Sequence, residues 1–257
     1  MGYKSKIEWT DHTHNPWQGC HKVSTGCLNC YMEREKKRYG ADPNIVVRSS
    51  DKLWREAYKW NKVAAEKGII ETVFVCSWSD FLIEEADQWR DEYWQIIRAC
   101  QNLRSILLTK REDRIVECLP PDWGEGYPNV CLAVTAENQA MADKRIPVLL
   151  SIPARWRMVS IEPMLGPIDL LQIPRPERFH QSPHGWGSWL AKELHWVVLG
   201  SESGPNRRPS DISWIQGTVN QCREMIPVFV KQCEINGKLS KDPQEWPEVL
   251  KVQARPW

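Results

Sequence analysis

Three cysteines that lie close together in the sequence are the residues best suited to do chemistry. Cys20, Cys27 and Cys30 follow the pattern C-x6-C-x2-C. Gly19 and Gly26 give the backbone of this loop the freedom to wrap around an ion. Thiolates from one loop can hold three irons of a 4Fe–4S cluster and leave the fourth iron open to another ligand. The pattern therefore predicts a metal or cluster site in this loop.

The same loop could bind zinc instead of iron. A structural zinc site has four ligands, and the fourth could come from one of three nearby histidines, His12, His14 or His21. The cysteine spacing does not decide between the two metals. The acidic side chains expected at the strand ends favour the cluster, because a structural zinc site has no need of them.

The other six cysteines are scattered along the chain. They are Cys76, Cys100, Cys118, Cys131, Cys222 and Cys233. The N-terminus shows no apolar leader, so all the cysteines are expected to stay reduced. A free cysteine in an apolar run behaves as a small hydrophobic side chain, and we expect these six to pack rather than react.

The composition is that of an ordinary globular protein. Hydrophobic residues make up 42% and charged residues 26% of the 257 residues. Lysine and arginine number 34 against 33 acidic residues, for a net charge of +1. A protein held to nucleic acid by its overall charge would be far more basic. No apolar run approaches the roughly 20 residues that a membrane span requires, so no membrane partner and a cytoplasmic location are expected.

Short apolar runs alternate with helical stretches along the chain. The expected strands are 7–9, 72–76, 105–108, 130–134, 157–161, 196–199 and 228–230. The expected helices are 31–39, 52–67, 86–102, 112–118, 139–150 and 212–225. This alternation predicts an α/β fold, a partial (β/α) TIM-like barrel of six or seven parallel strands. We expect a single domain over 1–257, with a lid-like insertion at about 174–187 and a C-terminal tail at about 234–257.

Polar residues follow the expected strands at the points where they end. They are Ser77, Trp78, Asp80, Thr109, Lys110, Glu137, Asn138, Glu162 and Glu202. In a parallel barrel the carboxyl ends of the strands meet at one face, where active sites lie. Helix capping accounts for about half of these residues, but it explains Glu162 and Glu202 poorly. The strand ends therefore predict a polar ring around one site.

Several blocks of the sequence carry a resemblance to a known family. The blocks are NPWQGCHKVS (15–24), GCLNCY (26–31), 73–80, 107–111, 134–138, 142–147, 160–169 and 200–209. In these blocks the chain resembles a phage-associated radical S-adenosylmethionine family, over most of residues 7–233. The resemblance implies a partial (β/α) barrel, a 4Fe–4S cluster on the three loop cysteines, and S-adenosylmethionine as cofactor. Two departures lie near the expected site: His14, where relatives tend to carry Trp, and Ser201, where many carry Gly.

The resemblance also suggests roles for individual residues. Asp80 is expected to accept a hydrogen bond from the methionine ammonium of the cofactor. The other expected cofactor contacts are Ser77, Thr109, Lys110, Glu137, Asn138 and Tyr31. Glu162 and Glu202 would face substrate or adenosine, and they form the candidate catalytic set together with His14. The electron would come from a donor such as flavodoxin or a chemical reductant.

A phage setting makes a base of DNA, or its nucleotide, the expected substrate. The chemistry would be a rearrangement or group addition, for instance at a thymine-derived side chain, so an isomerase or a transferase. A base in duplex DNA would have to be flipped out. Arg207 and Arg208 are the candidate phosphate contacts, and His14 and Trp78 the candidate contacts of the base. The alternatives are a radical enzyme acting on a peptide or small metabolite, and a zinc-stabilised nucleic-acid-binding module without catalysis.

Overall fold

The computed structural model describes residues 5–177 and 186–257, and these fall into two compact units. The first unit comprises Met1–Val23, Cys30–Leu132 and Pro153–Arg155. The second unit comprises Ser24–Asn29, Ala133–Ile152 and Trp156–Trp257. The cysteine loop contributes to both, because Cys20 and Cys30 belong to the first unit and Cys27 to the second.

Eight strands form one mostly parallel sheet in the order β1-β4-β5-β6-β7-β8-β9-β10. They are β1 (His12–His14), β4 (Glu71–Val75), β5 (Leu103–Thr109), β6 (Val130–Thr135), β7 (Trp156–Ile161), β8 (Trp196–Gly200), β9 (Val228–Ile235) and β10 (Lys238–Ser240). The pairs β1–β4, β4–β5, β7–β8 and β8–β9 are parallel, and β10 returns antiparallel to β9. The predicted partial (β/α) barrel is confirmed. Two further strands, β2 (Trp17–Gln18) and β3 (Val47–Arg48), form a separate antiparallel pair.

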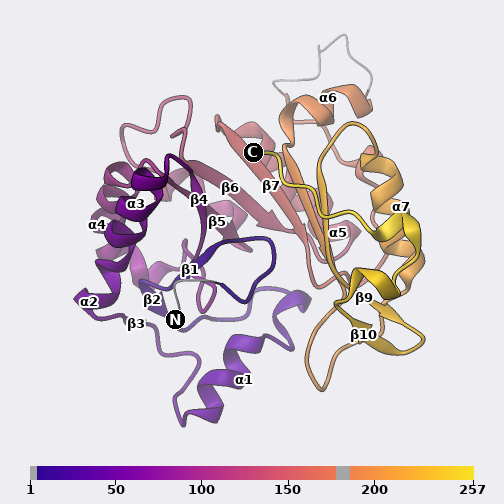
Figure 1. Cartoon of the computed structure of the whole chain (residues 1–257), viewed down its shortest axis with the longest axis horizontal. Coiled ribbons are helices and arrows are strands. Elements are labelled where there is room, and N and C mark those ends of the chain that lie inside the picture. The colour runs from indigo at the N-terminus through magenta and orange to yellow at the C-terminus, as the bar shows by residue number, and fades with distance from the viewer. Residues whose placement is uncertain (1–4, 178–185) are drawn as a thin grey trace. The chain divides into compact units, whose positions relative to one another are not determined.

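Helices occupy the connections, because parallel strands need crossovers. They are α1 (Tyr31–Arg38), α2 (Asp51–Trp54), α3 (Glu56–Lys67), α4 (Asp87–Ala99), α5 (Gln139–Ser151), α6 (Trp186–Glu193) and α7 (Ile212–Cys222). In the first unit α3 and α4 lie beside β4 and β5, and in the second unit α7 lies along β9 (Figure 1). The helix predicted over 112–118 is instead two 3-10 turns, Glu112–Arg114 and Val116–Cys118. None of the helices in the described part of the chain is long and apolar enough to cross a membrane.

Tryptophan and other aromatic side chains fill the core of the first unit. Trp17 is fully buried and packs against Phe81, with ring centroids 5.3 Å apart, and against Tyr93 at 6.0 Å. Trp94 also packs against Phe81 in a T-shaped arrangement, with ring centroids 5.3 Å apart. The indole N–H of Trp17 donates to the backbone oxygen of Asp80 at 3.0 Å. This packing holds the end of β4 beside the start of the cysteine loop.

The first strand lies five residues later than predicted. Residues 7–9 were expected to be extended, but β1 spans His12–His14 and pairs with β4, with His12 opposite Val73. Trp9 is buried against Phe74, and its apolar character produced the wrong expectation. The hydroxyl of Thr10 accepts from Phe74 N at 3.1 Å. This side-chain bond secures the segment before β1 without a strand there.

The C-terminal tail is ordered against the second unit. Val230 N donates to Val252 O at 2.8 Å and Ala254 N donates to Val228 O at 2.9 Å, so the tail lines the edge of β9. The ring of Trp257 meets the buried ring of Trp196 at 4.9 Å. Of the predicted insertion at 174–187, residues 178–185 lie outside the described residues, and α6 begins at Trp186.

Candidate functional site

The three loop cysteines differ from all the others in their exposure. Cys20, Cys27 and Cys30 are half-buried and take part in no disulfide, whereas each of the other six cysteines is buried. Reduced thiols that reach the surface of a short loop are a donor set that fits an iron–sulfur cluster. Among the described residues, no three His, Cys, Asp or Glu side chains lie grouped so as to hold a metal ion.

Burial makes most of the remaining thiols poor nucleophiles and poor ligands. It raises the pKa of Cys100 and Cys118 to about 11, and that of Cys222 to about 12. It also raises the pKa of Cys76 well above its usual value, and that of Cys233 to about 11. The thiolate is the reactive and metal-binding form, so these five thiols are protonated at neutral pH and pack as apolar groups.

Within the first unit, the segment after β4 holds both ends of the cysteine loop. The N–H of Gly19 donates to Trp78 O at 2.9 Å, and the hydroxyl of Ser79 donates to Gly19 O at 2.5 Å. At the other end, the Tyr31 hydroxyl donates to Ser77 O at 2.5 Å. Cys20 follows Gly19 and Cys30 precedes Tyr31, so the exit of β4 positions the two cysteines of this unit.

Arg111 brings a positive charge to the first cysteine. Its Nη1 lies 3.6 Å from the sulfur of Cys20, and its Nη2 donates to His21 O at 3.2 Å. The guanidinium is buried and also lies 3.4 Å from Asp80 Oδ2. Arg111 is not among the candidate site residues that the sequence predicts. Its position directly after the polar residues that end β5 was the available signal.

Asp80 is buried at the end of β4 and ties that strand to the end of β5. Its Oδ1 accepts from the Thr109 hydroxyl at 2.8 Å, and its Oδ2 accepts from Lys110 N at 3.0 Å. Leu82 N donates to Oδ1 as well, at 2.9 Å. Three of the predicted cofactor-binding residues therefore lie together, and Asp80 orients Arg111, which itself reaches Cys20.

In the second unit, the side chain of Glu137 is hydrogen-bonded to the middle of the cysteine loop. Its Oε1 accepts from Gly26 N at 2.9 Å, and its Oε2 accepts from Arg145 Nη1 at 2.8 Å. Burial by itself raises the pKa of this carboxyl, but hydrogen bonds from the loop and the Arg145 charge lower it overall. A Cβ at residue 26 would lie 2.9 Å from the carboxyl carbon of Glu137, so only glycine permits this close approach.

The ion pair between Glu202 and Arg208, called the clamp below, holds the same segment of the cysteine loop. Glu202 Oε2 accepts from Asn29 Nδ2 at 2.9 Å, and its carboxylate pairs with the Arg208 guanidinium through both oxygens. Arg208 Nη1 also donates to Thr25 O at 3.0 Å. Desolvation opposes the charge of Glu202, but these bonds lower its pKa. The loop residues on both sides of Cys27 are therefore bonded to the segment that follows β8.

His14 lies deep in the first unit. Its Nε2 donates to Leu53 O at 2.8 Å, and its Nδ1 lies 2.7 Å from the Tyr93 hydroxyl. With Nε2 protonated, Nδ1 is left to accept from Tyr93, which describes a neutral ring. Burial lowers the pKa of His14 to about 4. Both ring nitrogens thus bond inside the protein.

The remaining predicted residues have local partners of their own. Asn138 caps α5, since its side chain accepts from Met141 N at 3.0 Å. Arg207 Nη2 donates to Gly237 O at 2.6 Å. The indole of Trp78 is half-buried after β4, and Glu162 lies after β7 in an ion pair with Lys231.

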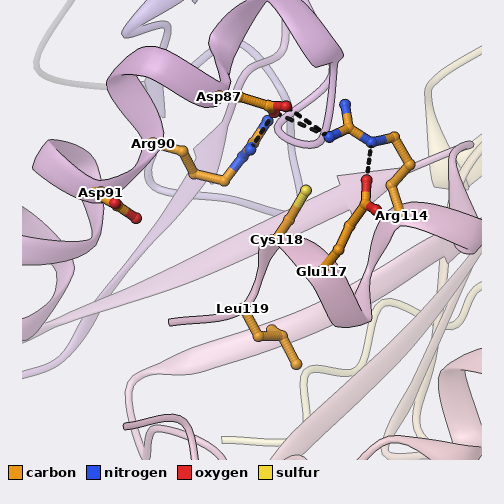
Figure 2. A pocket seen from close by; sticks show the side chains of 7 residues that line it. All are labelled: Asp87, Arg90, Asp91, Arg114, Glu117, Cys118 and Leu119. Atoms are coloured by element: carbon orange, nitrogen blue, oxygen red, sulfur yellow. Dashed lines mark hydrogen bonds and ion pairs between the residues drawn. The ribbon is translucent and has the colours of Figure 1, made fainter. Parts of the chain in front are cut away.

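A polar pocket of about 370 Å³ is lined by none of the predicted site residues. Figure 2 shows Asp87 between the guanidinium groups of Arg90 and Arg114, while Arg114 also reaches Glu117. The remaining lining residues are Asp91, Cys118 and Leu119. Because its arginines are bonded to neighbouring acids, the pocket is lined by an internal ion-pair network.

Comparison with solved structures finds backbones similar to this chain. One is spore photoproduct lyase complexed with dinucleoside spore photoproduct, which is 14% identical, has a TM-score of 0.48, and matches over 77% of this chain and 57% of that chain. Another is a mutant of the same lyase with bound AdoMet and dinucleoside spore photoproduct, also 14% identical with a TM-score of 0.48, over 84% of this chain and 62% of that chain. The chain thus spans about three fifths of these structures.

Comparison with sequences gives a family but no individual relative. A search of the curated proteins found no match. A family model described as "Protein of unknown function (DUF5131)" matches residues 4–245. Since that match covers nearly the whole chain, the protein belongs to this family.

Proposed function

We propose that this chain is a radical S-adenosylmethionine enzyme whose 4Fe–4S cluster is held by Cys20, Cys27 and Cys30. The observation that carries the proposal is the contrast among the cysteines: the three that share a loop are half-buried, and the six others are buried. Support also comes from the side chains that hold this loop, since Glu137 and Glu202 are buried acids whose hydrogen bonds go to its backbone and to Asn29.

When bound, the cluster would supply an electron that cleaves S-adenosylmethionine to methionine and a 5′-deoxyadenosyl radical. The chain's own residues would orient and shield that chemistry. Arg111 would donate toward the Cys20 sulfur, and Asp80 would keep Arg111 in place. Glu137 and the Glu202–Arg208 clamp would hold the loop on either side of Cys27. Lys110, whose side chain is half-buried after β5, would contact the cofactor carboxylate.

The substrate that we propose is a base of DNA or its nucleotide. Support comes from the sequence resemblance and from Trp78, whose half-buried indole offers a flat surface on which a base could stack. Arg207, which is half-buried and held by a looser contact of 3.6 Å with Glu234 and by a bond to Gly237 O, is the proposed phosphate contact. Arg208 is a weaker choice, because binding phosphate would mean giving up its bonds to Glu202 and Thr25.

The proposal is tested by reconstituting the protein with iron and sulfide under anaerobic conditions. We expect about four irons per chain, a brown colour, and 5′-deoxyadenosine from S-adenosylmethionine after reduction with dithionite. Cys27→Ala should lose the cluster, because one of its three thiolate ligands is gone. Cys118→Ala is the matched control, since it removes a buried thiol from the same chain.

Two results would contradict the assignment of the cluster to the three cysteines. One is a full iron complement in Cys27→Ala. The other is a colourless protein that binds zinc with the same three cysteines, which would indicate a structural metal site. A reduced protein with an intact cluster that releases no 5′-deoxyadenosine would rule out the radical reaction itself.

A further inference from the structure

Three strands of the second unit bring together polar side chains that the proposed cofactor does not use. Glu162 follows β7, Gly200 ends β8, and Lys231 and Gln232 lie on β9. Lys231 Nζ donates to Glu162 Oε1 at 2.5 Å, and the two side chains keep 15% and 18% of their surfaces exposed. The pair is therefore mostly shielded from water but still reachable by a ligand.

An irregularity in strand pairing sets the direction of Lys231. Leu199 pairs with Val230, whereas the next residue on β8, Gly200, pairs with Gln232. Lys231 is thus an extra residue on β9, which makes this a β-bulge. Bulges re-aim a side chain and are common next to active sites. Here the bulge accompanies the contact between Lys231 and Glu162.

The missing side chain at residue 200 leaves room for its neighbours. A Cβ there would lie 3.2 Å from Cγ of Glu162 and 3.5 Å from Cγ of Gln232. The first of these distances is too short for an unstrained contact. Glu162 and Gln232 therefore both lie on the side of Gly200 to which a side chain at this position would point.

Gln232 has a buried acceptor atom without a hydrogen-bond partner among the described residues. Its side chain is 1% exposed, and its Nε2 donates to Ser201 O at 2.7 Å. The acceptor atom is its Oε1. A buried polar atom without a partner costs free energy, and an N–H of a ligand would remove that cost.

The hydrogen-bonding capacity that remains defines what could bind. Within the described part of the chain, the ion pair is the only polar contact of either Lys231 or Glu162. Lys231 therefore keeps two N–H donors, Glu162 keeps its Oε2, and Gln232 keeps its Oε1. A matching ligand carries a carbonyl oxygen for the ammonium and an adjacent N–H for one of the two acceptors.

We infer that Glu162, Lys231 and Gln232 form a recognition subsite for the lactam group of a nucleobase. This inference rests on the proposed function, which makes a base the substrate, and it narrows the base to those with a carbonyl beside a ring N–H. Thymine, uracil and guanine carry that group, whereas adenine and cytosine do not. Enzymes that take a base out of the stack read it by such hydrogen bonds to its edge.

The test measures nucleoside binding to the reconstituted protein by isothermal titration calorimetry. Thymidine and guanosine should bind at least about tenfold more tightly than cytidine and adenosine, since a hydrogen bond to a charged group is worth that factor or more. Lys231→Met should abolish the preference. Lys238→Met, on the exposed part of the same hairpin, is the matched control and should keep it.

A charge-swapped variant separates recognition from stability. Lys231→Glu combined with Glu162→Lys keeps an ion pair but exchanges donor and acceptor, so a folded variant should lose the preference for lactam bases. Retention of the preference in this variant, or equal binding of all four nucleosides by the unchanged protein, would overturn the inference. Binding does not require cleavage of S-adenosylmethionine, so the subsite and the radical reaction can fail independently.

Discussion

At the scale of single residues, Arg111 connects the Asp80 carboxylate to the cysteine loop. Its guanidinium lies 3.6 Å from the Cys20 sulfur and 3.4 Å from the Asp80 carboxylate. A fixed positive charge beside a cluster ligand stabilises the reduced, more negative state of a cluster, and hydrogen bonds to sulfur tune its potential. On the proposed function, Arg111 would therefore act as a positioning residue with an electronic effect.

Replacing Arg111 should change the potential of the proposed cluster. In Arg111→Met the midpoint potential should fall by on the order of 50–100 mV, because a charged hydrogen bond to the ligand is lost. Arg111→Lys keeps the charge and should recover part of the difference. Redox titration followed by electron paramagnetic resonance measures both. An unchanged potential in Arg111→Met would show that the guanidinium serves only to pack the loop.

The sequence predicts which side chains lie together only where those residues directly follow neighbouring strands. The exits of β4 and β5 predicted that Asp80, Thr109 and Lys110 would lie together, and they do. His14 and Arg208 are bonded to residues distant in the chain, Tyr93 for the first and Thr25 for the second. No local sequence pattern predicts such pairings. From the sequence alone, His14 and Arg208 were therefore only candidate site residues.

At the scale of elements, the cysteine loop is held by the strand ends more than by its own hydrogen bonds. The exit of β4 bonds Gly19 and Tyr31, and Glu137, after β6, bonds Gly26. Close packing of the Gly26 backbone on a buried carboxyl is part of that support.

Adding one methyl group to the loop tests this support. Gly26→Ala places a Cβ against the Glu137 carboxyl, which Arg145 holds in place, so we expect a loss of about 1–3 kcal/mol in stability and a lower iron content. Gly217→Ala is the control, because nothing lies within 4 Å of a Cβ at that position in α7. It should be neutral or slightly stabilising. Equal iron content in both variants would mean that the loop can shift away from Glu137 without losing its ability to bind iron.

Most elements could be predicted because strands buried on both faces read as apolar runs. The expected run 130–134 differs from β6 by one residue, and the expected helix 139–150 differs from α5 by one residue. The first strand was misplaced because burial of Trp9 gives an apolar signal without extended backbone. The sequence predicts one helix over 112–118, whereas the structure has two short 3-10 helices there.

At the scale of the whole molecule, stability should depend on pH through a buried histidine. The pKa of His14 is lowered from 6.5 to about 4 in the folded protein. Between these values the unfolded chain binds a proton that the folded chain does not, so stability rises with pH from about 4 to 6.5. The difference corresponds to about 3 kcal/mol.

Urea unfolding between pH 4 and pH 7 measures this dependence. In His14→Asn, which cannot titrate, the slope of unfolding free energy against pH should flatten, although the variant is less stable throughout. A slope that survives in His14→Asn would assign the acid sensitivity to other groups.

The clamp on the cysteine loop also has a consequence for how the protein is made. Thr25 and Arg208, which are hydrogen-bonded to each other, lie 183 residues apart in the chain. A ribosome that adds 5–20 residues each second needs roughly 10–40 s to travel that distance. For most of that interval the three cysteines have been synthesised, whereas Arg208 has not. The nascent chain is thus open to oxidation or to a wrong metal, and loading of the proposed cluster belongs after translation has passed Arg208.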